Sequence, residues 1–491
     1  MGAESLVAGL AIIGIVIIVS ALLSGLVDRS GLPQVAVFIF IGAALGPAGF
    51  GVFDMKLDSP VLKVVATLSL TMVLFTDAVT LNTKEVRRHS GLAFRMLGPG
   101  TILCAALTAV AAWWLLAIPP SFAAILGAAL ASTDPVLLRG LLRRRDISLV
   151  TRQALQLESG LNDAVLLPVV VIAIALSGQH EFGSGVLAKM GFGLFILGPG
   201  AGIAIGLIAV AALDLIRKRI GVRRDYESLY SLGVALSAYA AAEAVHGSGF
   251  LAAFAAGMTI AALDVELCDC FIEYGGVTAE MLLLFTFVIF GSSLIWTGFS
   301  GLDARTVIFA VFAILIRVPI YLASMIGSEV DRRGRLLIAW FGPRGLSSLL
   351  LILLPVFAGV SGSDRLFRVC ALIVLISVVV HGSTPMLFAR LLGEREPEEP
   401  PPPPVPLKEP TALPVLELAE PVGAQSITLE ELDQLQKSGD EVILLDVRTE
   451  RSRDTSDLQA AGSIRMPPEN VVIQARELKL PKEAWLIAYC A

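Results

Sequence analysis

Charged residues are scarce in this chain. Asp, Glu, Lys and Arg together make up 16% of its 491 residues, whereas hydrophobic residues make up 55% and the mean hydropathy is +0.79. A chain of this composition is too apolar for a soluble globular protein and too long for a single membrane span. It has only five cysteines, and their scattered positions exclude a disulfide framework. The composition therefore predicts a protein that crosses a membrane many times.

Long apolar runs place the crossings. Each span needs about 20 apolar residues, so the sequence predicts an all-α polytopic membrane protein with about 13 spans. The first apolar run is too long for the core of a signal peptide and is therefore predicted to be the first span. The eighth and ninth spans are weakly separated, and their merger would give twelve. The predicted spans lie near residues 5–27, 33–50, 61–81, 92–117, 121–138, 154–177, 190–216, 227–245, 248–264, 277–297, 304–327, 335–357 and 366–390.

The charge of the loops predicts the orientation. Alternate loops are basic, and the clearest examples contain Arg143, Arg144 and Arg145 or Arg217, Lys218 and Arg219. Because lysine and arginine stay on the cytoplasmic side, the amino terminus is predicted outside and the carboxyl terminus inside. This arrangement needs an odd number of spans, although the acidic inner loop 264–275 breaks the pattern. We expect the protein to lie in the plasma membrane.

The tripeptide Thr133-Asp134-Pro135 interrupts the fifth predicted span. Proline removes a backbone donor and clashes with the preceding turn, so the chain is predicted to unwind near Thr133. Unwound backbone at membrane depth is tolerated around a cavity or buried protein, and its carbonyls can coordinate a cation. A compatible alternative is that Asp134 caps the start of a second half-helix.

The next span carries Glu158-Ser159-Gly160-Leu161-Asn162-Asp163. A carboxylate inside an apolar span is costly and rare unless it faces a cavity or a partner. Ser159 and Asp163 are four residues apart, so they share a helix face and are predicted to point at one ion. Asn162 offers a neutral oxygen that does not titrate. For Asp163 the alternative is a satisfied hydrogen bond between helices.

Four further residues complete the prediction. Glu158 is expected to pair with Arg317, because a buried arginine without a carboxylate would be very costly. Asp77, near the end of the third span, is either part of the ion pathway or a residue of the membrane interface. Gly342-Pro343-Arg344-Gly345 predicts a second broken helix, in which Arg344 is expected to cap half-helix carbonyls rather than take part directly in transport.

Several motifs, in order along the chain, resemble those of a known family. They are LFTDA, ASTDPV, ESGLNDA, AVHGSGFLAAFAAGM and WFGPRGLSSLL. They resemble the NhaP/sodium–hydrogen exchanger branch of the monovalent cation/proton antiporters, and the resemblance covers about residues 1–393. It implies inverted repeats, a core with two crossed broken helices, and a homodimer. No cofactor, nucleic acid or specific partner protein is expected.

The resemblance also implies roles for the residues. Asp163 is expected to be the carboxylate shared by cation and proton, and Asn162 takes the place of a second aspartate found in electrogenic relatives. One titrating carboxylate predicts electroneutral exchange of Na⁺ or Li⁺ for H⁺ by alternating access, with K⁺ as the alternative cation. The other implied groups are the ligands Ser159 and Thr133, Asp134 acting through a water, the Glu158–Arg317 pair, and Asp77, a shorter acid where relatives often have glutamate.

Beyond the last span the composition changes. Residues 394–399 are mostly acidic and 400–404 are all proline, so 394–424 is predicted to be an extended linker. Residues 425–491 resemble an incomplete α/β rhodanese-like domain, with the segments LEEL, LLDVR, AGSIRMP and LIAYC. Within this tail the pattern predicts a helix start at 426–432 and a buried strand at 442–447.

In a rhodanese-like domain Cys490 would be the nucleophile that carries a persulfide. A reactive cysteine needs a cradle of backbone donors and a following helix amino terminus, whereas this chain ends at Ala491. We therefore expect no sulfurtransferase activity from the tail as given. A sulfurtransferase or sulfur-sensing protein acting through Cys490 is the alternative from another functional class. Regulation of antiport by the tail is a further expectation.

Overall fold

The computed structural model describes most of the predicted membrane region and part of the tail. The chain forms two compact units, Met1–Glu398 and Glu399–Ala491, which are treated separately below. Cys490 and the predicted linker at 394–424 lie outside the described residues, as do most of the predicted first span and most of the predicted helix start at 426–432. The described residues are 14, 18, 34–51, 54–81, 86, 90–142, 147–178, 184–219, 224–263, 269–300, 302–391, 432, 435, 442–448, 460, 462–466, 478 and 485–489.

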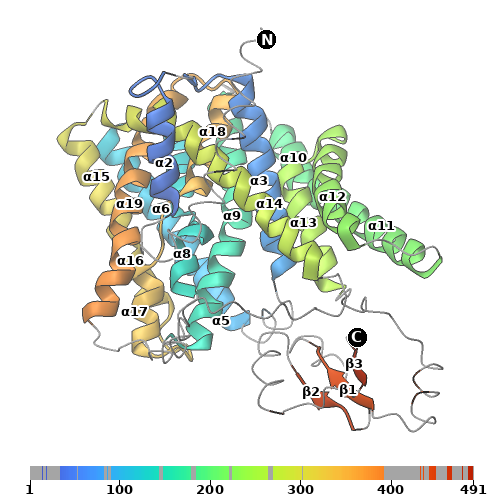
Figure 1. Cartoon of the computed structure of the whole chain (residues 1–491). Coiled ribbons are helices and arrows are strands. Elements are labelled where there is room, and N and C mark those ends of the chain that lie inside the picture. Colours follow the sequence, from blue (N-terminus) through green and yellow to red (C-terminus); the bar gives the residue numbers. More distant parts are fainter. Residues whose placement is uncertain are drawn as a thin grey trace. The chain divides into compact units, whose positions relative to one another are not determined.

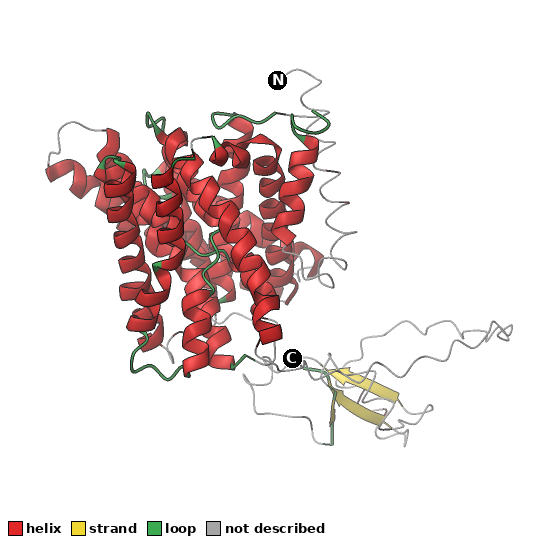
Figure 2. Cartoon of the chain, turned by 90° about the vertical axis from the view of Figure 1, so that its left-hand side faces the viewer, coloured by secondary structure: helices red, strands yellow, loops and turns green. Residues whose placement is uncertain are grey.

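The first unit is a bundle of helices (Figures 1 and 2). Its first part contains α2 (Gln34–Leu45), α3 (Pro60–Thr80), α5 (Ser90–Arg95), the π-helical segment η1 (Met96–Ile102), α6 (Leu103–Leu116), α7 (Pro120–Ala131), α8 (Pro135–Leu142) and α9 (Leu149–Gly178). Three of these helices, α3, α7 and α8, begin with a proline. Proline suits the first helical position because its missing N–H would have no partner there and its φ is already helical.

The second part of the bundle is also made of helices joined by short π-helical and 3₁₀ segments. It contains α10 (Ser184–Phe192), the π-helical η2 (Gly193–Leu197), α11 (Gly198–Arg219), α12 (Arg224–Ala244), α13 (Gly249–Ala262), α14 (Asp269–Ile289), the π-helical η3 (Phe290–Leu294), the 3₁₀ turn η4 (Ile295–Phe299), α15 (Ala304–Leu315), α16 (Arg317–Ser324), α17 (Arg332–Trp340), α18 (Leu346–Phe357) and α19 (Ser363–Leu391). Each predicted span after the first has helical counterparts among these elements.

Eight helical stretches in the described part of the chain are long and apolar enough to cross a membrane, and α2, α13 and α18 are shorter apolar helices. The predicted eighth and ninth spans form separate helices, α12 and α13. A turn parts them, in which His246 takes a left-handed φ of 58°. The total of about 13 spans, or twelve if these two form one span, stays a prediction.

Both predicted helix breaks are present. The fifth predicted span divides into α7 and α8, and Ser132, Thr133 and Asp134 between them are not helical. The twelfth divides into α17 and α18 around residues 341–345. The predicted span at 304–327 is divided more slightly, because Ile316 alone separates α15 from α16 and keeps helical φ and ψ of −61° and −26°. Ala304–Ser324 remains one helical stretch long enough to cross a membrane.

Two hydrophobic clusters hold the bundle together. The smaller is rich in alanine and joins α3 to α11, α12, α13 and α14, with Ala235, Ala238 and Ala253 fully buried. The larger draws on α7, α9, α18 and α19 together with other helices. Small residues allow helix backbones to approach closely where apolar lipid gives no driving force for association. The two helix breaks belong to elements of the larger cluster.

The described part of the tail is a three-stranded parallel sheet. Its strands are β1 (Val442–Asp446), β2 (Ile464–Arg465) and β3 (Trp485–Tyr489), in the order β2-β1-β3. Asp446 lies opposite Arg465 on one side and Tyr489 on the other. The predicted strand at 442–447 is confirmed and ends one residue earlier. The rhodanese-like assignment of the whole tail stays a prediction.

Candidate functional site

The two helix breaks meet, and Asp134 joins them. Its backbone N–H donates to the carbonyl of Pro343 at 2.9 Å. Its carboxylate accepts one hydrogen bond from the Val136 N–H at 2.9 Å and another from the Leu346 N–H at 2.7 Å. Asp134 therefore caps α8, as the sequence predicted, and it also caps α18. Because both oxygens hold helix termini, its water-mediated contact with a cation stays a prediction.

Glycines at the second break make room for charged side chains. A Cβ atom at Gly342 would overlap the guanidinium of Arg317, and a Cβ atom at Gly345 would overlap the carboxyl group of Asp134. The sequence indicated that these glycines interrupt a helix. The structure adds that they are needed for close approach, because any larger residue would displace a buried charge.

We expect Gly345→Ala to destabilise the protein by about 1–3 kcal/mol, the usual effect of overpacking. The added methyl would push the Asp134 carboxylate away from the N-termini of α8 and α18. Thermal unfolding in detergent would measure the loss. Gly233→Ala is the matched control: this glycine lies inside α12 with no atom within 4 Å of its added Cβ, so the change should be neutral or slightly stabilising. Equal melting temperatures for the two variants would contradict the proposed crowding.

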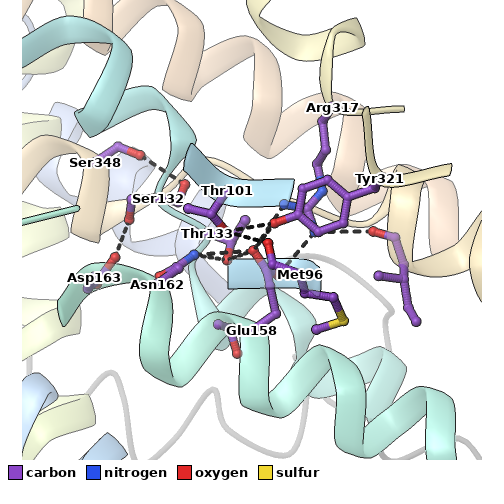
Figure 3. A network of polar contacts seen from close by, with 12 residues as sticks. Met96, Thr101, Ser132, Thr133, Glu158, Asn162, Asp163, Arg317, Tyr321 and Ser348 are labelled. Atoms are coloured by element: carbon purple, nitrogen blue, oxygen red, sulfur yellow. Dashed lines mark hydrogen bonds and ion pairs between the residues drawn. The ribbon is translucent and has the colours of Figure 1, made fainter. Parts of the chain in front are cut away.

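Asp163 lies at the same junction and is 1% exposed. Its Oδ1 accepts a hydrogen bond from the hydroxyl of Ser132 at 2.5 Å, as Figure 3 shows. Its Oδ2 is buried and has no hydrogen-bond partner. The alternative prediction, a hydrogen bond between helices that satisfies the side chain, therefore holds for one oxygen only. The other oxygen remains available to a proton or a cation.

Glu158 lies one turn earlier on α9 and is fully buried. The expected pair with Arg317 is present: Nη1 donates to Oε1 and Nη2 donates to Oε2, both at 3.0 Å. Nη2 also donates to the carbonyl of Ile338 at 3.1 Å. This two-point geometry is the strong form of an arginine–carboxylate contact. It ties α9 to the start of α16 and to α17.

Sequence reasoning missed Tyr321 in this network. The Tyr321 hydroxyl donates to Glu158 Oε1 at 2.9 Å and lies 3.0 Å from the Thr101 hydroxyl. The Arg317 guanidinium lies over its ring, 3.8 Å from the ring centroid. A usable signal was present in the sequence, because Tyr321 follows Arg317 by four residues and such residues share a helix face.

Asn162 and Thr133 connect this network to the first break. The Asn162 amide nitrogen donates to the Thr133 hydroxyl and to Glu158 Oε1, and the Thr133 hydroxyl donates to the same oxygen at 3.2 Å (Figure 3). The Asn162 Oδ1 atom is buried without a hydrogen-bond partner. The neutral amide therefore supports Glu158 through its nitrogen, and its oxygen is a second buried acceptor close to Asp163 in sequence.

Ser159 departs from its predicted direction. Its hydroxyl donates to the Gln156 carbonyl at 3.3 Å, one turn back along α9. It lines a pocket of about 410 Å³ between α3, α8, α9 and α14, which also includes Asp77, Gln156 and Glu280. Asp77 is half-buried, and its Cβ lies 3.8 Å from a Cβ built at Gly160. Asp77 thus lines this pocket beside α9, which supports the ion-pathway alternative for this residue.

Arg344 is buried at the second break, and its expected cap of half-helix carbonyls stays a prediction. Its Nε and Nη1 atoms have no hydrogen-bond partner, so neither atom caps a half-helix carbonyl. Its backbone N–H donates to the Ser377 hydroxyl at 2.7 Å, and that hydroxyl also contacts His381 Nδ1 at 3.0 Å. The backbone of Arg344, rather than those two side-chain atoms, links the break to α19.

The tail has a small polar site of its own. The Arg448 guanidinium donates to Asp446 Oδ1 at 2.9 Å and to Oδ2 at 2.7 Å. These bonds hold the pKa of the Asp446 carboxyl at about 2. The Tyr489 hydroxyl accepts from the Ala460 N–H at 3.2 Å. The Val447 N–H donates to the Tyr489 carbonyl at 3.2 Å and so joins the carboxyl ends of β1 and β3. Cys490 lies outside the described residues.

The chemistry of the helical site suits a monovalent ion. Across the described ranges, no group of three or more His, Cys, Asp or Glu side chains is placed to hold a metal ion. Among the described residues of α9, the buried side-chain oxygens without a hydrogen-bond partner are Asp163 Oδ2 and Asn162 Oδ1. Oxygen atoms of this kind are the ligands that hard cations prefer. One carboxylate oxygen at this depth can bind either a proton or such a cation.

Comparison with known proteins gives three consistent results. Residues 15–389 match the family model described as the transmembrane region of the sodium/hydrogen exchanger. The K(+)/H(+) antiporter NhaP2 of Shewanella sp. (strain ANA-3) is 27% identical over 394 residues, which cover 78% of this chain and 66% of that protein. The K(+)/H(+) antiporter NhaP of Alkalimonas amylolytica is 25% identical over 396 residues, with coverage of 79% and 67%.

A solved structure shows the same fold. The sodium proton antiporter MjNhaP1 from Methanocaldococcus jannaschii at pH 8 superimposes with a TM-score of 0.64. The match covers 77% of this chain and 99% of that one, at 17% sequence identity. These similar proteins are transporters rather than enzymes.

Proposed function

This chain belongs to the sodium/hydrogen exchanger family, and from that premise we propose that it exchanges a monovalent cation for a proton at Asp163. The observation that carries the proposal is the Asp163 Oδ2 atom, which is buried and has no hydrogen-bond partner. A buried carboxylate without a counter-charge is costly, so it favours binding a proton or a cation. The two ions then compete for one oxygen, and that competition couples their movements.

The two breaks supply the setting for this exchange. The half-helices α8 and α18 start beside Asp163, and Asp134 joins their N-termini. Broken helices at membrane depth are the usual way in which transporters place backbone and side-chain groups around an ion. We propose that the helices around the breaks move as one body, so that Asp163 faces each side of the membrane in turn.

The buried charges support one-for-one exchange. Among the described residues of the helical unit, the fully buried carboxylates are Asp134, Glu158 and Asp163, and the buried guanidiniums belong to Arg317 and Arg344. This set leaves one unbalanced negative charge. One proton or one monovalent cation neutralises it, so both loaded forms of the site have the same net charge. We therefore propose electroneutral antiport.

Na⁺ or Li⁺ is the cation that we propose, and K⁺ is the second candidate. The resemblance of the motifs to the NhaP branch supports Na⁺, and the solved structure of the same fold is that of a sodium proton antiporter. K⁺ is supported by the two curated relatives, both named as K(+)/H(+) antiporters. The chain spans about two thirds of the length of these relatives, 66% and 67%.

Purified protein in proteoliposomes tests the proposal. An imposed proton gradient should collapse when Na⁺ or Li⁺ is added, without any change in a voltage-sensitive dye. Collapse by K⁺ alone would keep the mechanism and change the substrate. A membrane potential that the dye reports during exchange, and that does not develop in protein-free liposomes, would contradict electroneutrality. Protein-free liposomes and the Asp163→Asn variant are the controls.

The remaining assignments are proposals of the same kind. The basic loops support a plasma-membrane protein with its amino terminus outside and its carboxyl terminus in the cytoplasm. Family resemblance supports a homodimer. We also propose that the tail, in which β1 pairs with two parallel strands, is a rhodanese-like module that adjusts antiport rather than a sulfurtransferase.

A further inference from the structure

Two serine hydroxyls, one from each interrupted helix, lie beside the Asp163 carboxyl. Ser132, at the end of α7, donates to Oδ1 at 2.5 Å. Ser347, in the first turn of α18, lies near the same carboxyl. The side chains are 0% and 4% exposed, respectively. Neither residue stood out in the sequence, and ion exchange as proposed above uses only Oδ2.

The position of Ser132 is fixed by its surroundings. Its backbone is extended, with φ −62° and ψ 139°, so the chain leaves α7 at this residue. Its carbonyl accepts from the Ser348 hydroxyl at 3.5 Å, which links the first break to α18. The carboxylates of Asp134 and Glu158 act on Asp163 through their charge, and both accept hydrogen bonds from other groups. The Ser132 hydroxyl is therefore a dedicated donor to Asp163.

We propose that Ser132, assisted by Ser347, stands in for the transported ion between the departure of one ion and the arrival of the next. The inference rests on the proposed function, because it assumes that Asp163 exchanges ions. A hydroxyl that donates to a charged carboxylate makes a short and strong hydrogen bond, and 2.5 Å falls within that range. Such a bond stabilises the charged carboxylate when neither ion is bound. A proton or cation at Oδ2 draws negative charge away from Oδ1 and weakens this bond, so the stand-in gives way to either ion.

Stabilising the free carboxylate has a kinetic consequence. The donor competes with the proton and with the cation alike, so it lowers the affinity for both. It also eases the release of each ion, which every transport cycle requires. Ser132 is therefore a positioning residue that lowers the affinity of Asp163 for both ions and raises the rate at which they are released. A ligand of the cation would have the opposite effect, because its loss would weaken binding.

The test compares cation affinity with maximal rate in proteoliposomes at one fixed pH, set high enough that the proton no longer competes with the cation for Asp163. Ser132→Ala should lower the apparent KM for the transported cation about tenfold, the smaller end of what a hydrogen bond to a charged group contributes, and should also lower the maximal rate. Ser132→Cys keeps a similar volume but has only a weak donor, so it should shift both values in the same direction. Ser347→Ala should show a smaller shift of the same sign.

Ser292→Ala is the matched control. Ser292 is 2% exposed, and its hydroxyl donates to the Ile289 carbonyl at 2.8 Å, so this variant should keep the wild-type KM and rate. A raised KM in Ser132→Ala would identify a cation ligand and overturn the inference, as would unchanged values in both Ser132 variants. Wild-type protein that exchanges no monovalent cation would instead refute the proposed function itself.

Discussion

Replacing Asp163 with Asn should reduce exchange to the level of protein-free liposomes. The amide has nearly the same shape, and its oxygen can still accept the Ser132 hydroxyl that Oδ1 accepts at 2.5 Å. It neither binds a proton near neutral pH nor carries the negative charge that holds a cation. The loss should therefore appear in transport while the protein still folds. Collapse of an imposed proton gradient, followed with a pH-sensitive dye, measures it.

Asp303→Asn is the matched control, because it makes the same chemical change outside the candidate site. Asp303 caps α15 by accepting from the Thr306 N–H at 2.8 Å, and asparagine caps a helix about as well. This variant should exchange ions like the wild type. If Asp163→Asn kept its exchange, the shared carboxylate would have to lie elsewhere, and Asp77 in the neighbouring pocket would be the next residue to test.

The second large effect concerns folding. Glu158→Gln should destabilise the protein by about 3–5 kcal/mol, the usual effect of leaving one member of a buried ion pair without its partner. Arg317, which donates twice to this carboxylate at 3.0 Å and is 2% exposed, would become an uncompensated buried charge. Thermal unfolding of the purified protein in detergent measures the change.

Two further variants separate charge from hydrogen bonding. Tyr321→Phe removes one donor to Glu158 but leaves the ion pair, so its effect should be smaller than that of Glu158→Gln. Adding Arg317→Met to Glu158→Gln removes both charges and should recover part of the lost stability. If the double variant were less stable than Glu158→Gln alone, the uncompensated charge of Arg317 would not be the cause of the lost stability.

Much of the helical architecture can be predicted from the sequence because its signals are local. Apolar runs of span length follow from the cost of burying backbone in lipid. Pro135 and Pro343 mark the two breaks because proline cannot continue a helix. Pro319 lacks the N–H that would bond to the Leu315 carbonyl, so it marks the step from α15 to α16. The span prediction did not use this local signal.

The candidate site could be predicted in its charges, in one ion pair and in one helix cap, but not in its other contacts. Asp163 and Glu158 stand out because a carboxylate in an apolar run is rare and costly. A pair with Arg317 followed from the same cost. Ser159 was assigned by its spacing from Asp163, yet its hydroxyl bonds within its own helix. Spacing along a helix identifies a shared face, but it does not determine the atom to which a rotatable hydroxyl donates.

The sequence by itself determined that this chain is a multi-span membrane protein with two broken helices and a buried carboxylate, because each of these follows from the cost of placing a residue in lipid. Only the tertiary structure decided which groups meet at the carboxylate. Ser132 reaches Asp163, and Asp134 caps α18 through Leu346, 212 residues away. Contacts at such separations depend on how complete helices pack, and packing is a property of the whole bundle.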